Sequence, residues 1–330
     1  MTQFRHSFGL ASLSLIAAAL AAEPALAQTW PSRPLTLVVP FAAGGGADIM
    51  GRVVAARLSE LLGQQVIVEN LGGAGGMTGA FRVAKAAPDG YQIVLGTNGT
   101  HAQNQTLYKK PLYNAATDFA PVALIAEQPI VLMARQDLPA DNLKAFIAYA
   151  KVNHADMKYG SAGAGSAVQL SCVLLNAAVG ISVTHVPYRG SAPAMQDLIA
   201  GRIDYQCANV GPAVGQIESK LVKAIAILTR NRTAILPALP SAHEQGLTDF
   251  EAFIWYALFL PKGTPAPIVQ KLNAATVAAM NTPAVQQWMK DNGAELVAAE
   301  RRSPEYLARL VESEIEKWAG PIKASGVSAD

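Results

Sequence analysis

The sequence has few cysteines and no strong excess of charge of either sign. Cys172 and Cys207 are the only cysteines among 330 residues, and their spacing fits no metal-binding signature. The formal net charge is +2, and the basic residues are scattered along the chain without forming a run. A nucleic-acid partner therefore has no electrostatic support, because proteins that bind nucleic acids carry a clustered basic patch.

The chain also lacks the short motifs by which common enzyme classes bind cofactors or activate nucleophiles. It contains no G-x-G-x-x-G, no G-K-[ST], no G-x-S-x-G and no H-E-x-x-H. Beyond the N-terminal segment, no two histidines stand at metal-ligand spacing from each other. We therefore expect no metal, no cofactor and no enzymatic activity. An enzyme on the same scaffold is the weaker alternative, with His185 or Cys172 as its best candidate residue, since a fold does not fix a function.

The N-terminal segment has the layout of a cleavable secretory signal. A basic stretch at residues 5–6 precedes an apolar run over residues 8–22, and Ala25-Leu26-Ala27 follows. The apolar run is shorter than the roughly 20 residues that a permanent membrane anchor needs. We therefore expect residues 1–27 to be a signal peptide that is cleaved after Ala27. Export would expose the two cysteines to an oxidising compartment, where a disulfide between them is favoured over two buried free thiols.

Strand and helix patterns alternate along most of the remaining chain. Short β-rich runs are followed by glycine-rich turns and amphipathic segments. The expected strands are residues 35–39, 66–69, 91–95, 130–134, 158–159, 183–186, 203–207 and 223–228, and the expected helices include residues 48–62, 143–151, 166–179 and 192–200. This alternation predicts an α/β protein whose mainly parallel sheets are covered by helices.

The last third of the chain has a different pattern. A long apolar strand is expected over residues 250–260. Three helices follow, and each opens with a hydroxyl residue and a proline: Thr264-Pro265, Thr282-Pro283 and Ser303-Pro304. We expect each hydroxyl to cap its helix, with proline at the first helical position, where no amide donor is needed.

Four loops that contain glycine follow strands and are the candidate ligand-binding elements. They lie at residues 41–48, 96–100, 161–166 and 187–190. In parallel α/β sheets, ligands bind beyond the carboxyl ends of the strands, and a helix that starts there directs free amides toward an anion. None of these loops is rich in Lys or Arg, and Arg189 is the exception. We therefore expect recognition to depend mainly on backbone amides, hydroxyls and water.

A series of short motifs along the chain resembles one receptor family. The motifs are Pro40-Phe41-Ala42-Ala43-Gly44-Gly45 with Asp48, Val68-Glu69-Asn70, Gly72-Gly73-Ala74-Gly75-Gly76, Pro88-Asp89-Gly90-Tyr91, Asp118-Phe119-Ala120-Pro121-Val122, His185-Val186-Pro187-Tyr188-Arg189-Gly190, Pro193-Ala194, Asp197-Leu198, Pro261-Lys262-Gly263-Thr264-Pro265 and residues 314–318. In this order they resemble the substrate-binding receptors of tripartite tricarboxylate transporters, the Bug receptor family. The resemblance covers essentially the whole chain after the N-terminal segment.

The resemblance implies a two-lobed periplasmic binding protein of type II-like fold, with a hinge of two crossing strands. The first lobe would comprise residues 28–127 and 254–330, and the second lobe residues 128–253. Such a receptor would act as a monomer, bind a small carboxylate (a di- or tricarboxylate, an acidic amino acid or an aromatic acid) and deliver it to a membrane permease with one large and one small subunit. A sensory module that presents its ligand state to a membrane kinase is the alternative, because it shares the same binding chemistry.

The resemblance also assigns the ligand contacts position by position. These are Phe41, Ala42, Gly45, Asp48, Thr97 and Asn98 on one wall, and Ser161, Gly165, Ser166 and Tyr188 on the other. The chain departs from the family pattern at Gln169, where His is usual, at Ala208, where an acidic residue is common, and at Ala43, where proline is frequent. The first two changes lie near the second wall, so the ligand is expected to differ from those of better-known relatives. The sequence around both cysteines resembles a subgroup with aspartate-type receptors, which implies an acidic amino acid as ligand.

Overall fold

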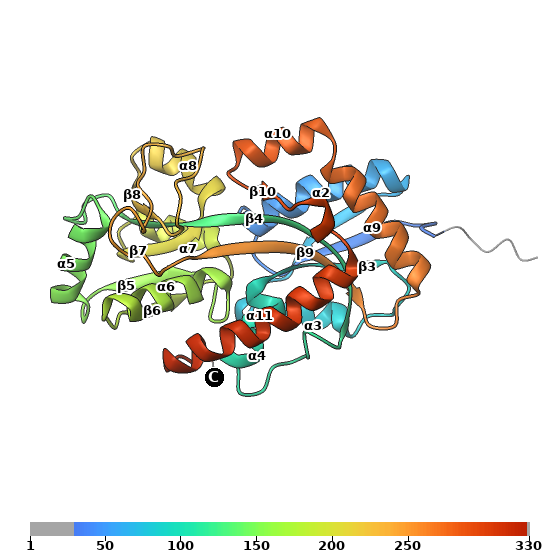
Figure 1. The fold of residues 1–330 in the computed structure, drawn as a ribbon, viewed down its shortest axis with the longest axis horizontal. Coiled ribbons are helices and arrows are strands. Elements are labelled where there is room, and N and C mark those ends of the chain that lie inside the picture. The colour runs from blue at the N-terminus through green and yellow to red at the C-terminus, as the bar shows by residue number, and fades with distance from the viewer. Residues whose placement is uncertain (1–29, 329–330) are drawn as a thin grey trace, which may run out of the picture.

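Two long antiparallel strands run through the molecule and join its two lobes. The structure is a computed structural model that describes residues 30–328. β4 (Phe119–Arg135) pairs with β9 (Phe253–Pro261) through its first half, and its second half continues into the other lobe. Figure 1 shows both strands crossing from one lobe to the other. The strand expected at residues 130–134 is therefore the far part of a 17-residue strand.

The first lobe contains a set of three parallel strands next to β9. Their order is β2-β1-β3, and β3 pairs antiparallel with β9. The strands are β1 (Leu35–Val39), β2 (Val66–Asn70), β3 (Gln92–Thr97) and the short β10 (Glu295–Leu296), which pairs with β4. The helices and helical turns of this part are α2 (Gly46–Leu62), η1 (Ala74–Gly76), α3 (Met77–Ala84), η2 (Gly99–Gln103), α4 (Asn104–Leu107), α9 (Ala266–Met280), α10 (Pro283–Asp291), η3 (Ala299–Arg301) and α11 (Pro304–Ala324).

The second lobe repeats this arrangement around the other half of β4. Three parallel strands lie in the order β6-β5-β7, and β7 and β8 each pair antiparallel with β4. The strands are β5 (Lys158–Ser161), β6 (Thr184–Pro187), β7 (Tyr205–Asn209) and β8 (Val222–Ile227), and the helices are α5 (Leu143–Asn153), α6 (Ala167–Val179), α7 (Ser191–Ile199) and α8 (Val210–Glu218). α8 was not expected from the sequence, and it begins directly after β7.

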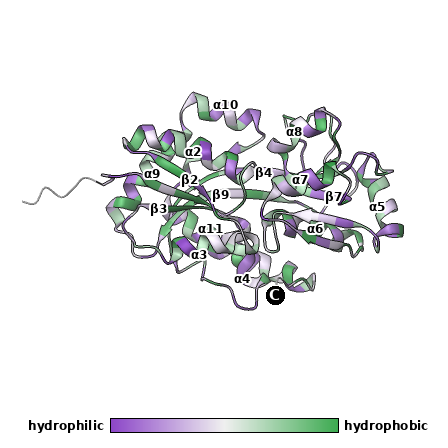
Figure 2. Ribbon diagram, turned by 180° about the vertical axis from the view of Figure 1, so that it is seen from behind, coloured by the Kyte–Doolittle hydropathy of each residue, from purple (hydrophilic) through white to green (hydrophobic). Residues whose placement is uncertain are grey.

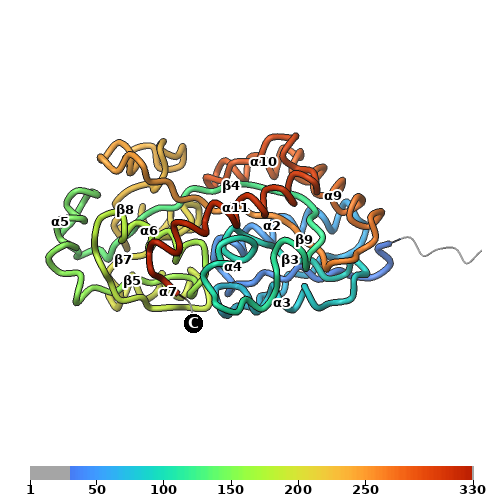
Figure 3. Tube along the Cα trace, turned by 60° about the horizontal axis from the view of Figure 1, so that its bottom comes forward, coloured from blue at the N-terminus to red at the C-terminus, as the bar shows by residue number. Residues whose placement is uncertain are grey.

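The predicted α/β fold with two lobes and two crossing strands is confirmed. Hydrophobic residues concentrate on the buried strands, while the helices carry hydrophobic and hydrophilic residues in alternation (Figure 2). One apolar cluster extends through both lobes along β4 and β9. Ile322 in the last turns of α11 shares a small apolar cluster with Leu107 of α4 and with Leu170 of α6 in the second lobe, and Figure 3 shows the end of α11 near the second lobe. The lobes are thus joined by the crossing strands and by this helix.

A disulfide ties α6 to the sheet of the second lobe. Cys172 on α6 and Cys207 on β7 are both buried and joined, with their Cα atoms 5.6 Å apart. The expected signal peptide and its cleavage after Ala27 lie outside the described residues. Within residues 30–328, no helix combines the length and the apolar character needed to cross a membrane.

The expectation for the three hydroxyl-proline helix starts is only partly correct. Ser303 caps α11, because its side chain accepts a hydrogen bond from the amide of Tyr306. Thr264 and Thr282 do not cap their helices, since each hydroxyl donates to a carbonyl of the preceding turn. A threonine hydroxyl that is already used in this way is not available to the helix amides.

Candidate functional site

Loops from both lobes meet beside the crossing strands and enclose a small cavity, which we call the inner cavity. Its walls come from Phe41 and the start of α2 on one side and from the starts of α6, α7 and α8 on the other, with Ile254 of β9 also in its lining. Its volume is about 20 Å³, room for about one water molecule.

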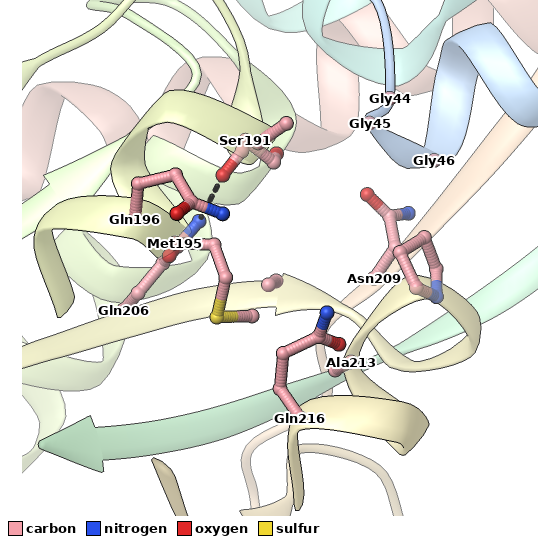
Figure 4. Close-up of a pocket in the computed structure, with 13 residues that line it drawn as sticks. Gly44, Gly45, Gly46, Ser191, Met195, Gln196, Gln206, Asn209, Ala213 and Gln216 are labelled. Carbon is pink, nitrogen blue, oxygen red and sulfur yellow. Dashed lines mark hydrogen bonds between the residues drawn. The ribbon is translucent and has the colours of Figure 1, made fainter. Parts of the chain in front are cut away.

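A larger cavity of about 140 Å³, the outer cavity, adjoins the inner one. The two share Gly45, Gly46, Ser191 and Asn209 in their linings. The outer cavity extends along α7 and α8 to Met195 and to three glutamines, and Figure 4 shows these side chains around the space. Together the cavities offer a narrow end and a wider neutral end.

Four helices begin at the lining of the inner cavity. Gly45 precedes α2, Ser166 precedes α6, Ser191 is the first residue of α7 and Asn209 precedes α8. The first amides of a helix lack intrahelical partners and carry the positive end of the helix dipole. Among the described residues that line either cavity, none is Asp, Glu, Lys or Arg. The arrangement is therefore suited to an anion that is held by backbone amides.

The two lobes are closed on each other in this structure. The amide of Ala42 in the first lobe donates to the carbonyl of Arg189 in the second lobe at 2.9 Å. The hydroxyl of Tyr108 donates to the carbonyl of Ala164 at 2.8 Å. A β-carbon on Gly46 would lie 2.7 Å from the side chain of Asn209, so only glycine permits this approach.

The loop before α2 is held by a charged cluster centred on Asp48. This carboxylate is 3% exposed and accepts hydrogen bonds from the amide of Gly44, from Asn70 and from Arg52. Burial alone would raise the pKa of Asp48, but these hydrogen bonds together hold it below its usual value. Asn70 also donates to the carbonyl of Phe41 at 3.0 Å. Asp48 thus stabilises the loop through these hydrogen bonds and does not line either cavity.

The loop before α6 is held by neutral groups. The hydroxyl of Ser166 donates to the carbonyl of Gly163 at 2.7 Å and accepts from the amide of Gln169. The hydroxyl of Ser161 lies 2.7 Å from Nε2 of His185 and accepts from the amide of Gly163. Burial lowers the pKa of His185 to about 4, so the imidazole is neutral at physiological pH. Neither Ser161 nor His185 lines the inner or the outer cavity, and both support the loop.

The other candidate residues also lie around the cavities and not in their linings. Asn98 donates to the carbonyl of Phe253 at 3.0 Å, and the hydroxyl of Thr97 accepts from the amide of Thr100. The hydroxyl of Tyr188 donates to Asp197 on the outside of α7. Of the ten candidate residues, those that line the inner cavity are Phe41, Gly45 and Ser166, whereas Ala42, Asp48, Thr97, Asn98, Ser161, Gly165 and Tyr188 surround it.

Two lining residues that the sequence analysis missed are Ser191 and Asn209. Ser191 follows the candidate loop at residues 187–190 directly. Asn209 ends β7 and starts α8. Because no helix was expected between the strands at residues 203–207 and 223–228, the sequence analysis placed no helix N-terminus at Asn209. An apolar helical pattern at residues 210–218 was the signal that could have revealed it.

Asn209 is fixed by residues of the crossing strands. Its Nδ2 donates to the hydroxyl of Tyr256 on β9 at 2.8 Å and to Oε1 of Gln128 on β4 at 3.2 Å. Gln128 in turn donates through Nε2 to the carbonyl of Asn292 at 2.8 Å. A polar network thus connects the cavity to the crossing strands. Among residues 30–328, no three His, Cys, Asp or Glu side chains gather closely enough to hold a metal ion.

Comparisons with known proteins agree on one family. The family model described as "Tripartite tricarboxylate transporter family receptor" matches residues 50–327. The periplasmic binding protein BugD is similar in structure, with a TM-score of 0.87, 39% identity and coverage of 91% of this chain and 99% of BugD. MatC from Rhodopseudomonas palustris, solved with bound malate, has a TM-score of 0.86, 40% identity and coverage of 89% and 100%. Rpa4515 from R. palustris, solved with adipate, has a TM-score of 0.86, 36% identity and coverage of 91% and 99%.

Proposed function

Because this chain belongs to the tripartite tricarboxylate transporter receptor family, we propose that it is a periplasmic receptor that binds a small carboxylate between its two lobes. The observation that carries the proposal is the convergence of four helix N-termini on a cavity without charged side chains. The similar proteins MatC and Rpa4515 were solved with malate and adipate, two dicarboxylates, which supports the same class of ligand for this chain.

The shapes of the two cavities support a particular placement of the ligand. The inner cavity has room for little more than one carboxylate group, and the starts of α2 and α6 face it through Gly45 and Ser166. Hydrogen bonds from amides to a carboxylate are charge-assisted and strong where water is excluded. The remainder of the ligand would occupy the outer cavity of about 140 Å³. In this arrangement Phe41 closes the narrow end.

Binding is coupled in this proposal to closure of the lobes. We place the lobe boundaries where β4 passes from the first sheet to the second and near the start of β9, with residues 28–127 and 254–330 in one lobe and residues 128–253 in the other. Hinge closure around a ligand is a common movement of two-lobed proteins, and short stretches of strand can absorb it. The interlobe hydrogen bond between Ala42 and Arg189 would form only in the closed, liganded state.

The closed receptor would then deliver its ligand to a membrane permease with one large and one small subunit. Under this proposal the chain is exported, cleaved after Ala27 and active as a monomer. Its relatives are receptors, which supports binding and delivery over catalysis. Uptake of the ligand into vesicles that carry the permease pair should require the receptor. Uptake at the same rate without it would contradict the delivery step.

The binding step is tested by thermal unfolding of the purified protein with a panel of aliphatic, aromatic and amino carboxylates. A ligand at one hundred times its dissociation constant stabilises a fold by about 2.7 kcal/mol, which raises the unfolding midpoint measurably. Each acid is compared with its neutral amide, which matches it in shape. We expect stabilisation by one class of acid and none by its amides. Equal stabilisation by acid and amide would contradict recognition of a carboxylate.

A further inference from the structure

Asn209 occupies the junction of the inner and outer cavities and presents one hydrogen-bonding atom to them. It is 4% exposed and appears in the linings of both cavities. We propose that Oδ1 of Asn209 determines specificity by accepting a hydrogen bond from a hydroxyl group next to the bound carboxylate, so that the receptor selects hydroxycarboxylates. This inference depends on the proposed carboxylate-binding function and narrows its ligand class.

The orientation of the Asn209 amide is set by a chain of hydrogen bonds that starts at a backbone carbonyl. The carbonyl of Asn292 can only accept, so Nε2 of Gln128 must face it and Oε1 of Gln128 must point the other way. That Oε1 accepts from Nδ2 of Asn209. The hydroxyl of Tyr256 donates to the same Oε1 and therefore accepts from Nδ2 as well.

A flipped amide would place Oδ1 of Asn209 against Oε1 of Gln128, where two acceptors would meet without a proton. The network therefore directs Oδ1 away from the strands and toward the glycine turn before α2 (Figure 4). Within residues 30–328, no group donates a hydrogen bond to this oxygen. Oδ1 lines the cavities with its acceptor capacity free, so a ligand that supplies a donor can bond to it without breaking a hydrogen bond inside the protein.

Oδ1 lies next to the position where the carboxylate is proposed to bind. A β-carbon built on Gly46, in the first turn of α2, would be 2.8 Å from it. A carboxylate on the amides of this turn would hold its neighbouring carbon close to Oδ1. The substituent on that carbon is therefore the group that Oδ1 of Asn209 would contact. At neutral pH the ligand's own carboxyl groups are ionised and cannot supply the proton.

The neutral lining favours a hydroxyl over an ammonium group as the donor. No carboxylate lines either cavity among the described residues. Asp48 is the nearest acidic residue in the α2 start, and both of its oxygens are already bonded to Gly44, Asn70 and Arg52. An ammonium group would lose its hydration without gaining a counter-charge from the protein, and such burial is unfavourable. A hydroxyl needs only the one acceptor that Asn209 provides.

The test compares the affinities of matched acids by calorimetry on the purified protein. The pairs are propionate with lactate, succinate with malate, glutarate with 2-hydroxyglutarate, and phenylacetate with mandelate. Each pair is measured together with the amino acid that carries an ammonium group in place of the hydroxyl. In the pair that fits the cavity, we expect the hydroxy acid to bind about tenfold more tightly than the unsubstituted acid, as one hydrogen bond to a buried acceptor provides. The amino acid should bind more weakly than the hydroxy acid.

Two variants assign the preference to Asn209. In Asn209→Leu the ratio between the paired acids should fall to about one, while Gln286→Leu, on the exposed side of α10 and outside both cavities, should keep it. If Asn209→Leu does not fold, Asn209→Asp keeps the shape and an acceptor, and its added charge should weaken both acids of the pair together. A tenfold preference that survives in Asn209→Leu, or a loss confined to the hydroxy acid in Asn209→Asp, would overturn the assignment.

The outcomes for the wild type separate this inference from the proposed function. If acids bind but the paired acids bind equally, or the amino acid binds most tightly, the role of Asn209 is refuted and the receptor function stands. If no acid of any pair binds, carboxylate recognition itself is refuted, and the inference falls with it.

Discussion

The loop before α2 and the loop before α6 face each other across the cavity but are built differently. The first is braced by a buried carboxylate, Asp48, with Asn70 and the cation Arg52. The second is braced by neutral groups, mainly the hydroxyls of Ser161 and Ser166. Both designs place a helix start at the inner cavity and keep charged side chains out of its lining. The comparison teaches that Asp48, Ser161 and Ser166 each bond to the backbone of their own loop, and that Ser166 also lines the inner cavity.

Replacing Asp48 tests the charged cluster that holds the loop before α2, and it should have the largest effect on stability. Asp48→Ala leaves the amide of Gly44 and the side chain of Asn70 without their partner. Unpaired buried groups cost about 1–3 kcal/mol each, while the exposed Arg52 adds little. We expect the free energy of unfolding, measured in urea, to fall by roughly 3 kcal/mol, and ligand affinity to fall with it.

Asp48→Asn is the matched control, because it keeps the size of the side chain but cannot accept all three hydrogen bonds. It should fall between the wild type and Asp48→Ala in stability. Wild-type stability in both variants would show that the charged cluster does not hold the loop.

Replacing Gly46 tests the contact between the start of α2 and Asn209, and it should weaken ligand binding. A β-carbon at this position would lie within 2.9 Å of three atoms of Asn209 in the closed structure. The open state relieves this contact, so Gly46→Ala should unfold near the wild-type temperature without ligand. We expect affinity to fall about tenfold, because closure must then displace Asn209 at a cost of roughly 1.4 kcal/mol.

Gly215→Ala on α8 is the control, since a β-carbon there meets no atom within 4 Å. It should bind as the wild type does. If Gly46→Ala also binds with unchanged affinity, the ligand-bound state is not the closed arrangement of this structure.

Replacing Ser166 tests the neutral groups that hold the loop before α6, and it should lower stability less than the loss of Asp48. Ser166→Ala removes the cap of α6 and the hydrogen bond to the carbonyl of Gly163. Loss of a serine cap typically destabilises a protein by about 1 kcal/mol. Ser166→Thr keeps the hydroxyl and should recover most of the loss in urea unfolding. An effect as large as that of Asp48→Ala would remove the distinction between the two loops.

The sequence predicted the fold more completely than it predicted the site. Strands such as Leu35–Val39 and the alternation of elements follow from local patterns, which a single sequence contains. The engagement of Asp48 by Asn70 and that of Ala42 by Arg189 depend on contacts between segments that are separate in the sequence. Asn209 was missed because its role depends on a helix start after β7 and on partners in β4 and β9, which only the folded chain brings together.

The two loops should also differ in the pH range over which each loses stability. The pKa of Asp48 is held below its usual value of 3.8, so its contribution is complete above about pH 4 and is lost only in stronger acid. The pKa of His185, which supports the other loop, is lowered from 6.5 to about 4 by burial. Between these two values the unfolded chain takes up a proton that the folded chain does not, so stability falls as pH falls from 6.5 to 4.

His185→Gln tests this difference, because glutamine can still bond to Ser161 but does not titrate. We expect the fall in unfolding free energy between pH 7 and pH 5 to be smaller in the variant, by less than about 1 kcal/mol after solvent screening of this half-buried group. Burial also lowers the pKa of His101 to about 3, so this residue should contribute part of the loss of stability at falling pH in both proteins. For a ligand whose carboxyl groups stay ionised over this range, affinity should stay constant in both proteins, since no titratable side chain among the described residues lines the cavities. If unfolding free energy falls with pH by the same amount in the variant, His185 does not make the loop before α6 sensitive to acid. The two loops would then not differ in this way.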